Sequence, residues 1–347
     1  MRSVMRDRLL LVAMVAAVIP GFAQSNANLQ TYFRQSIGLS QHEITSIQSG
    51  TPITKPLPSR TPSEVFLFGA VYIHAAPGQY LRFSRDFNRL RKLPDYLALE
   101  VFGTPPKLSD LKGFSFEDDD VQALRDCALA DCQIQLPEMS IEELHRSVDW
   151  TAADANQQAN QFLQKSELRH LMAYQREGDL ALGVYDDKRD PAEVAQDFAS
   201  LLSYDTVLPG RLPEFYHYIL VYPNDKPANV EDLFYWEKVK FGLKPTLRVV
   251  QVLTRRGNPG DDIAYAIAEK QLYSSHYFET SLDFTFCVRG DDGPNHPGFY
   301  LIMVMGSKQA GLNGFLGSIV RDVAVDRSVS SLQHTLTTIK RALESGH

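Results

Sequence analysis

The chain has 347 residues, of which 44% are hydrophobic and 22% are charged, and its formal net charge at pH 7 is −7. This length exceeds that of a typical single domain, and the hydrophobic fraction suffices for a large core. The acidic balance argues against nucleic acid or an anionic lipid surface as an electrostatic partner, because both attract basic proteins.

The first 23 residues have the three parts of a cleavable secretory signal peptide. Three arginines among residues 1–8 form a basic region, and an apolar run follows at residues 9–19. A membrane-spanning helix needs about 20 apolar residues, so this run is too short to be an anchor. Small residues before the cut predict cleavage after Ala23. We therefore expect a soluble mature protein in the periplasm or outside the cell, with no stable membrane insertion.

Residues 24–62 form a polar leader that ends in a proline-rich stretch. Three prolines between residues 52 and 58 exclude a helix there, so the stretch is interpreted as a linker. Aromatic and β-branched residues then predict a strand over residues 65–74. A helix is predicted to begin at Pro77, because apolar residues recur every three or four positions after it. A second strand is predicted over residues 96–102.

The middle of the chain, about residues 105–205, is predicted to be a helical insertion. The predicted helices span residues 116–127, 140–147, 151–177 and 190–201, and a capping box of Ser140 and Glu143 opens the second. Cys127 and Cys132 lie five positions apart, which favours a local disulfide in an oxidising compartment. A metal site is the alternative, but no cysteine or histidine lies at the paired spacing of a zinc site.

From residue 215 onward, hydrophobic residues alternate with period two, which predicts strands. These strands span residues 215–222, 230–241, 246–255, 263–288, 298–306 and 318–325, with a bend or bulge in the longest at residues 274–275. The chain is predicted to close with a helix over residues 328–343. An apolar stripe of Leu332, Leu336, Ile339 and Leu343 runs along that helix.

Two stretches carry a likeness to a known superfamily. Residues 70–87, AVYIHAAPGQYLRFSRDF, form a strand, a small-Pro turn and a helix with a late aspartate. Residues 298–305, GFYLIMVM, begin the closing strands that lead into the terminal helix. These features resemble the START-like and polyketide-cyclase-like proteins of the helix-grip (SRPBCC) superfamily, mainly over residues 65–102 and 230–345.

The resemblance implies a single α+β domain over residues 63–347. In it, a curved antiparallel sheet would grip the long C-terminal helix and enclose an apolar cavity. The resemblance implies no catalytic residues, because most members bind ligands without a shared catalytic set. Fold analogy by itself does not fix function.

Seven residues of the predicted strands are candidates for ligand binding: Tyr235, Trp236, Arg248, Glu269, His276, Tyr277 and Glu279. Arg248 and Glu269 are expected to pair across neighbouring strands. His276, Tyr277 and Glu279 would orient a ligand headgroup, or else belong to a solvated strand face with a satisfied histidine. Trp236, beside Lys238, either lines the mouth of a pocket or is a core aromatic flanked by lysines.

The sequence has no motif for nucleophilic catalysis, phosphate binding, zinc or calcium, so no catalytic residue, metal or cofactor is predicted. The leading hypothesis is an exported protein that binds an apolar or amphipathic, lipid-like small molecule in a cavity between the sheet and the terminal helix. One alternative is an enzyme of the same shape, a cyclase or hydrolase, with acid–base groups among His276, Tyr277, Glu279 and Arg248. Another is an interaction module of the cell envelope, which would expose a large apolar patch.

Overall fold

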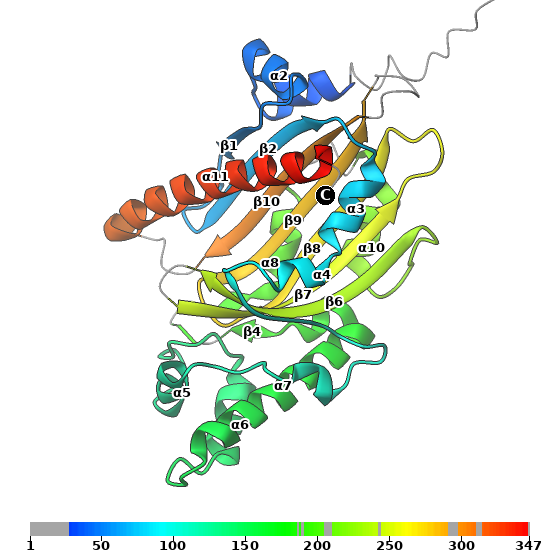
Figure 1. Ribbon diagram of the computed structural model, residues 1–347. Coiled ribbons are helices and arrows are strands. Elements are labelled where there is room, and N and C mark those ends of the chain that lie inside the picture. The colour runs from blue at the N-terminus through cyan, green and yellow to red at the C-terminus, as the bar shows by residue number, and fades with distance from the viewer. Residues whose placement is uncertain are drawn as a thin grey trace, which may run out of the picture.

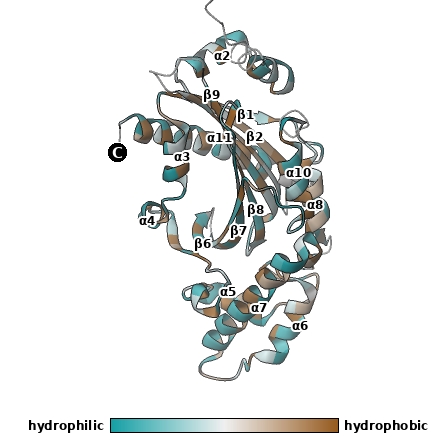
Figure 2. Ribbon diagram, turned by 90° about the vertical axis from the view of Figure 1, so that its right-hand side faces the viewer, coloured by the Kyte–Doolittle hydropathy of each residue, from teal (hydrophilic) through white to brown (hydrophobic). Residues whose placement is uncertain are grey.

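The computed structural model shows a mixed α+β fold. It describes residues 28–185, 187–188, 191–204, 210–241, 244–290, 298–309 and 314–345. The predicted signal peptide, residues 1–23, lies outside the described residues. An eight-stranded antiparallel sheet forms the centre, with the long C-terminal helix on one face and helices of the middle segment on the other (Figures 1 and 2).

The strands of this sheet are ordered β1-β2-β10-β9-β8-β7-β6-β3. Their bounds are β1 (Ile53–Leu57), β2 (Glu64–Ile73), β3 (Tyr96–Val101), β6 (Val230–Phe241), β7 (Lys244–Arg256), β8 (Ile263–Ser274), β9 (Phe278–Arg289) and β10 (Phe299–Gln309). A short pair, β4 (Val184–Tyr185) and β5 (Ala192–Glu193), lies outside this sheet. Because β2 pairs with β10, the first long strand and the last are neighbours.

The helices of the described residues include the predicted ones and two, over residues 41–48 and 213–221, that were not predicted. The α-helices are α2 (Gln41–Gln48), α3 (Pro77–Ser84), α4 (Phe87–Leu90), α5 (Asp118–Arg125), α6 (Glu138–Ser147), α7 (Ala155–Glu177), α8 (Val194–Leu202), α10 (Pro213–Val221) and α11 (Gly314–Glu344). Short turns of other helix types are η1 (Tyr32–Ser36), η2 (Leu108–Leu111) and η3 (Gly178–Ala181). The predicted fold class, an antiparallel sheet with a helical middle segment and a long C-terminal helix, is confirmed.

The proline-rich end of the leader is part of the fold, so its interpretation as a linker was wrong. Strand β1 pairs with β2, and helix α2 buries Ile44 and Ile47 completely. The prolines excluded a helix but not a strand at the sheet edge. Pro56 lies in β1, and an edge strand tolerates a residue that lacks a backbone N–H.

Three local predictions in the rest of the chain were also wrong. Of residues 215–222, predicted as a strand, all but the last fall in α10, which begins with Pro213 and buries four residues of an aromatic-rich run. Tertiary burial there outweighs the strand propensity of aromatic residues. Residues 318–325 belong to α11. Ser140 lies inside α6, whose N-cap is Pro137, so the predicted capping box is replaced by a proline start.

The long run at residues 263–288 is two strands joined by a tight turn at residues 275–277. The predicted irregularity at residues 274–275 is therefore a full reversal of the chain, and β8 and β9 pair with each other as a hairpin. Tyr277 adopts a φ of 66° in this turn, a left-handed conformation that non-glycine residues seldom adopt. The reversal decides which way the polar residues of this region point.

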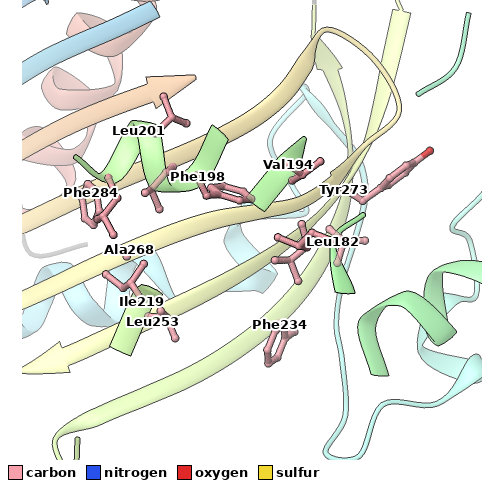
Figure 3. Packing of buried hydrophobic residues seen from close by; sticks show 14 of the residues in the cluster. Leu182, Val194, Phe198, Leu201, Ile219, Phe234, Leu253, Ala268, Tyr273 and Phe284 are labelled. Atoms are coloured by element: carbon pink, nitrogen blue, oxygen red, sulfur yellow. The ribbon is translucent and has the colours of Figure 1, made fainter. Parts of the chain in front are cut away.

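The sheet has two buried faces. The α8 face carries Phe234, Leu253, Ala268 and Phe284, which pack against α8, α10 and the middle segment (Figure 3). The α11 face carries Tyr235, Val250, Ile267, Cys287 and Leu301, which belong to a separate apolar cluster with α3 and α11. Alternate residues of each strand thus serve two cores, as the period-two pattern requires.

Helix α11 packs on β1 and β2, at one edge of the sheet. Its stripe is buried at Leu332, Leu336, Ile339 and Leu343, as the periodicity predicted. Gly69 of β2 permits this close approach, because a Cβ there would lie only 2.8 Å from Leu336 Cδ1. Helix α3 contacts β8 and β9 instead, so the two helices cover different parts of the α11 face.

Two buried tyrosines on the α8 face allow a matched test of this packing. The Tyr174 hydroxyl donates to Gln251 Oε1 at 2.6 Å, whereas the buried Tyr273 hydroxyl has no hydrogen-bond partner among the described residues. We expect Tyr174→Phe to lower the free energy of unfolding by about 1–3 kcal/mol, because Gln251 then loses a buried partner. Tyr273→Phe should change it by less than about 0.5 kcal/mol. Urea denaturation measures both, and equal losses would contradict the assigned bond.

Candidate functional site

A cluster of charged side chains lies on the α11 face, on strands β6 to β9. Arg248 Nη1 donates to Glu237 Oε1 at 2.9 Å, and Arg248 Nε donates to Gln271 Oε1 at 3.0 Å. Glu237 stands directly opposite Arg248 in the register of β6 and β7, and its side chain is only 4% exposed. The guanidinium is therefore fixed from two neighbouring strands.

Glu269 and Asp283 add two carboxylates to this cluster and face each other in the register of β8 and β9. Glu269 is exposed to solvent, yet desolvation, followed by the charges of Asp283 and Glu237, raises its pKa to about 7. Burial raises the pKa of the half-buried Asp283 to about 6. The Glu269 carboxylate is therefore accessible to solvent while the surrounding strands and the neighbouring carboxylates favour its protonated form.

The cluster has three carboxylates and one guanidinium. Burial raises the pKa of Glu237 as well, although Arg248 acts in the opposite direction. One positive charge cannot balance three neighbouring negative charges, so repulsion favours a protonated carboxyl group in the cluster near neutral pH. A protonated carboxyl group beside an ionised one can donate and accept hydrogen bonds, and it can exchange a proton with a bound molecule.

Apolar side chains flank the charged cluster on the same face. Met305 stands opposite Asp283 in the register of β9 and β10, and both Met303 and Met305 are half-buried. Val325 and Val329 of α11 are half-buried members of the same apolar cluster. The α11 face therefore combines accessible apolar surface, including adaptable methionines, with fixed polar groups.

Three of the seven candidate residues, Tyr235, Arg248 and Glu269, lie together on the α11 face. The expected pair of Arg248 with Glu269 is replaced by the close ion pair of Arg248 with Glu237. The register explains this correction, because Glu269 stands opposite Val252, four residues along β7 from Arg248. Arg248 still acts on Glu269 through its charge and lowers the pKa of that carboxyl group against the larger effect of desolvation.

Trp236 lies on the opposite face, in the core. It is 1% exposed, and its Nε1 donates to the backbone oxygen of Asp110 at 2.7 Å. The interpretation of Trp236 as lining a pocket mouth was therefore wrong, and the core alternative is confirmed. A tryptophan at this depth buries a large apolar surface and satisfies its single donor.

His276 and Tyr277 lie in the β8–β9 turn and have structural partners. His276 Nε2 lies 3.1 Å from Asp120 Oδ2, and Lys244 Nζ lies 2.8 Å from Asp120 Oδ1. Burial acts to raise the pKa of Asp120, but the hydrogen bonds from His276 and Lys244 hold it below its ordinary value. The Tyr277 hydroxyl accepts the backbone N–H of Lys244 at 2.8 Å. These contacts tie the turn to α5 and to the start of β7.

Glu279 lies away from the charged cluster, with its nearest cation, Lys308, at 3.9 Å. Lys308 also pairs with Asp197 of α8 at 2.8 Å, so Glu279 belongs to a network between α8 and the ends of β9 and β10. Burial raises the pKa of Glu279. His276, Tyr277 and Glu279 therefore all lie outside the charged cluster.

Neither a family model, nor a curated protein, nor a solved structure matches this chain. The helix-grip resemblance therefore stays a prediction from the residues. Over the part of the chain that the structure describes, no group of three or more His, Cys, Asp or Glu side chains could hold a metal ion. No described helix combines the length and the apolar character needed to cross a membrane.

Sequence reasoning missed Glu237, Gln271 and Asp283 as site residues. Each interrupts an apolar alternation at a position that faces the α11 side, for example Asp283 between Leu282 and Phe284. A polar residue on the inward face of an otherwise buried strand was the available signal. It could identify the positions but not their neighbours, because register is set by pairing between distant strands.

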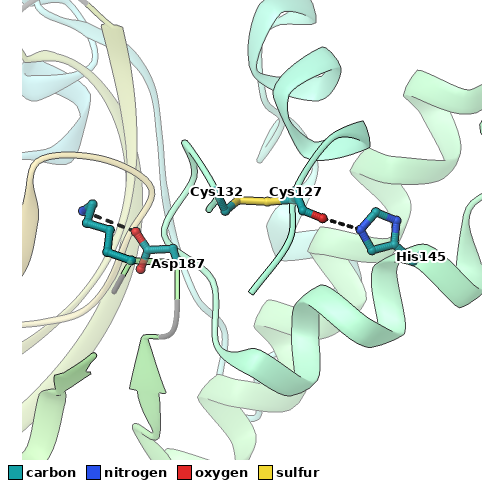
Figure 4. Close-up of a disulfide and its surroundings, with 5 residues drawn as sticks. Cys127, Cys132, His145 and Asp187 are labelled. Carbon is teal, nitrogen blue, oxygen red and sulfur yellow. Dashed lines mark hydrogen bonds and ion pairs between the residues drawn. A yellow bond between two sulfur atoms is a disulfide. The ribbon is translucent and has the colours of Figure 1, made fainter. Parts of the chain in front are cut away.

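A disulfide joins Cys127 and Cys132, in the segment between α5 and α6 (Figure 4). The backbone oxygen of Cys127 lies 2.6 Å from His145 Nε2, and the Cys132 N–H donates to the backbone oxygen of Asp187 at 3.0 Å. The closed loop thus connects α6 with the segment that follows β4. The disulfide therefore anchors the middle segment. It is remote in sequence from the residues of the charged cluster.

The raised pKa values predict that stability falls as pH rises. Between about pH 4 and 7 the folded protein holds protons on Glu269 and Asp283 that the unfolded chain has released, because folding raises the pKa values from 4.5 to about 7 and from 3.8 to about 6. The free energy of unfolding should therefore decrease with pH across this window. Urea denaturation should show a shallower decrease for Glu269→Gln, whereas Glu142→Gln, at an exposed ion pair, should follow the wild type. Identical slopes for all three proteins would contradict the assignment.

Proposed function

We propose that this chain is an exported binding protein for an amphipathic, lipid-like small molecule, held on the α11 face of the sheet. The observation that carries the proposal is the accessible carboxylate of Glu269, which has a raised pKa and stands opposite Asp283 on a face that also carries half-buried apolar side chains. Ligand sites are commonly apolar with a few fixed polar groups that set orientation. The polar end of the ligand would meet Glu269, Asp283 and Arg248, and its apolar part would lie along Met303 and Met305.

Export is part of the proposal and rests on the signal-peptide features of residues 1–23. The disulfide between Cys127 and Cys132 supports an oxidising compartment. The order of elements, with α3 after the first long strand and α11 packed on the sheet, supports the helix-grip resemblance from which the binding hypothesis came. No covalent chemistry is needed for this role.

The test is native mass spectrometry of the chain from Gln24 onward, purified without detergent, followed by solvent extraction. We expect a reproducible excess mass that extracts as an apolar or amphipathic molecule, and saturable binding of a fluorescent fatty-acid analogue. Met303→Gln should reduce the fraction of protein that carries the ligand, because it places an amide on the apolar part of the α11 face. Met172→Gln, at an exposed methionine of α7, is the matched control and should bind as the wild type does.

A bare mass from the folded protein, together with no saturable binding of the analogue, would refute the proposal. Equal loss of binding in Met303→Gln and Met172→Gln would also refute the assigned face. Circular dichroism of each variant shows whether a loss of binding comes from unfolding.

A second candidate function is favoured by one observation, the pairing of two carboxyl groups with raised pKa values on adjacent strands. With a pKa near 7, Glu269 is suited to general acid or base catalysis, and Arg248 could stabilise developing negative charge. In this case the extracted molecule would be converted on incubation with fresh protein, and Glu269→Gln would stop the conversion without releasing the ligand. A molecule recovered unchanged would leave binding as the function.

A further inference from the structure

Three arginines converge on one cavity where α3 meets the ends of β7 and β8. The cavity has a volume of about 360 Å³ and is lined by Gly78, Leu81, Arg82, Arg85, Arg256 and Tyr265. It lies on the α11 face, at the end of the sheet away from Arg248, since Arg256 is eight residues further along β7. A cavity of this size lies within the range of small-molecule sites, about 300–1,000 Å³.

The charges around this cavity are unbalanced. Glu231 pairs with two of the three arginines: it accepts from Arg85 Nη1 at 2.8 Å and from Arg256 Nε at 3.0 Å. These two arginines hold the pKa of Glu231 below its ordinary value. Arg82 is exposed and has no ion-pair or hydrogen-bond partner among the described residues. One carboxylate therefore stands against three guanidinium groups.

The donors of this cavity are also partly fixed in place. Two nitrogens of Arg256 donate to Glu231, Nε at 3.0 Å and Nη2 at 3.4 Å. The Arg256 guanidinium lies 6.0 Å from the centre of the Tyr265 ring. Glu231 engages only Nη1 of Arg85, so the other N–H donors of Arg85 can bind another acceptor. All the N–H donors of Arg82 can do so too. Leu81 and the Tyr265 ring add an apolar wall.

We infer that this cavity binds a phosphomonoester or a similar doubly charged oxyanion, with Arg82 and Arg85 as the principal donors. Guanidinium groups present paired N–H donors that match the oxygens of phosphate, and like charges gathered in one cavity repel each other until an anion neutralises them. The group could belong to a free phosphorylated metabolite or to the headgroup of an anionic lipid. The inference does not depend on the proposed function, because it uses none of the residues of the charged cluster.

Calorimetric titration of the mature protein at constant ionic strength tests this site. One arm uses inorganic phosphate and glycerol 3-phosphate. The other uses phosphatidylcholine vesicles with and without phosphatidic acid. Binding in the first arm identifies a free phosphate ligand, and binding only to vesicles that contain phosphatidic acid identifies a lipid headgroup. The absence of saturable binding in both arms would overturn the inference.

Two variants distinguish specific binding in the cavity from a general effect of surface charge. Arg82→Gln should weaken binding about tenfold, as expected for the loss of a charge-assisted hydrogen bond. Its side chain is exposed and without a described partner, so the fold should be unaffected. Arg327→Gln removes the same charge from an exposed position of α11 and should leave binding unchanged. Equal weakening in Arg82→Gln and Arg327→Gln would overturn the assigned cavity. Arg256→Gln removes another guanidinium group of the cavity and should also weaken binding.

Discussion

We expect Arg248→Met to lower the free energy of unfolding by about 3–5 kcal/mol at pH 7, which is the usual effect of removing one partner of a buried ion pair. Glu237, only 4% exposed, would lose its ion-pair partner, and Gln271 would lose a donor. Glu269 and Asp283 would lose the nearby positive charge that opposes their repulsion. Urea denaturation monitored by circular dichroism measures the loss.

The pH dependence of this loss identifies its cause. The effect of Arg248→Met should shrink as pH falls from 7 to 5, because protonated carboxyl groups need no counter-charge. Arg169→Met, which breaks an exposed pair with Glu143, should cost less than about 1 kcal/mol at every pH. The double variant Arg248→Met with Glu237→Leu should recover most of the loss, since an apolar pair can replace a buried ion pair. A loss that does not change with pH would contradict the electrostatic account.

We expect Gly178→Ala to destabilise the protein by about 3 kcal/mol or more, as the sum of backbone strain and overpacking. Gly178 ends α7 with a φ of 62°, and a Cβ there would lie 1.8 Å from the backbone oxygen of Tyr222. Backbone cannot move aside as a flexible side chain can. The next residue, Asp179, forms an ion pair with the fully buried Lys270, so a shift of this turn would also disturb a buried charge.

Gly183→Ala provides the matched control for that substitution. Gly183 has a similar φ of 70°, but a Cβ there would meet no atom within 4 Å. It should therefore show the strain alone, about 1 kcal/mol, as for a non-glycine residue in the left-handed region. If the free energies of unfolding of the two variants differ by less than about 0.5 kcal/mol, steric contact at Gly178 is not the cause.

Features that depend on nearby residues were predictable from the sequence. The apolar stripe of the terminal helix, the strand over residues 230–241 and the helix over residues 151–177 follow from periodicity. The structure has all three, although the terminal helix begins earlier, at Gly314. The spacing of Cys127 and Cys132 likewise permits a local bond. In each case the deciding interaction spans a few turns of one helix or neighbouring residues of one strand.

Features that depend on distant residues were decided by the tertiary structure. The proline-rich leader forms strand β1 only because β2 provides an edge, and residues 215–221 form a helix because the α8 face buries their aromatic side chains. The sequence located Arg248 and Glu269 but not the ion pair with Glu237 or the contact with Asp283. Those neighbours follow from the registers of β6 to β9, and a shift of one residue would turn each side chain to the other face. The sequence by itself therefore determined which residues can form the site, and the long-range pairing of strands decided which of them meet.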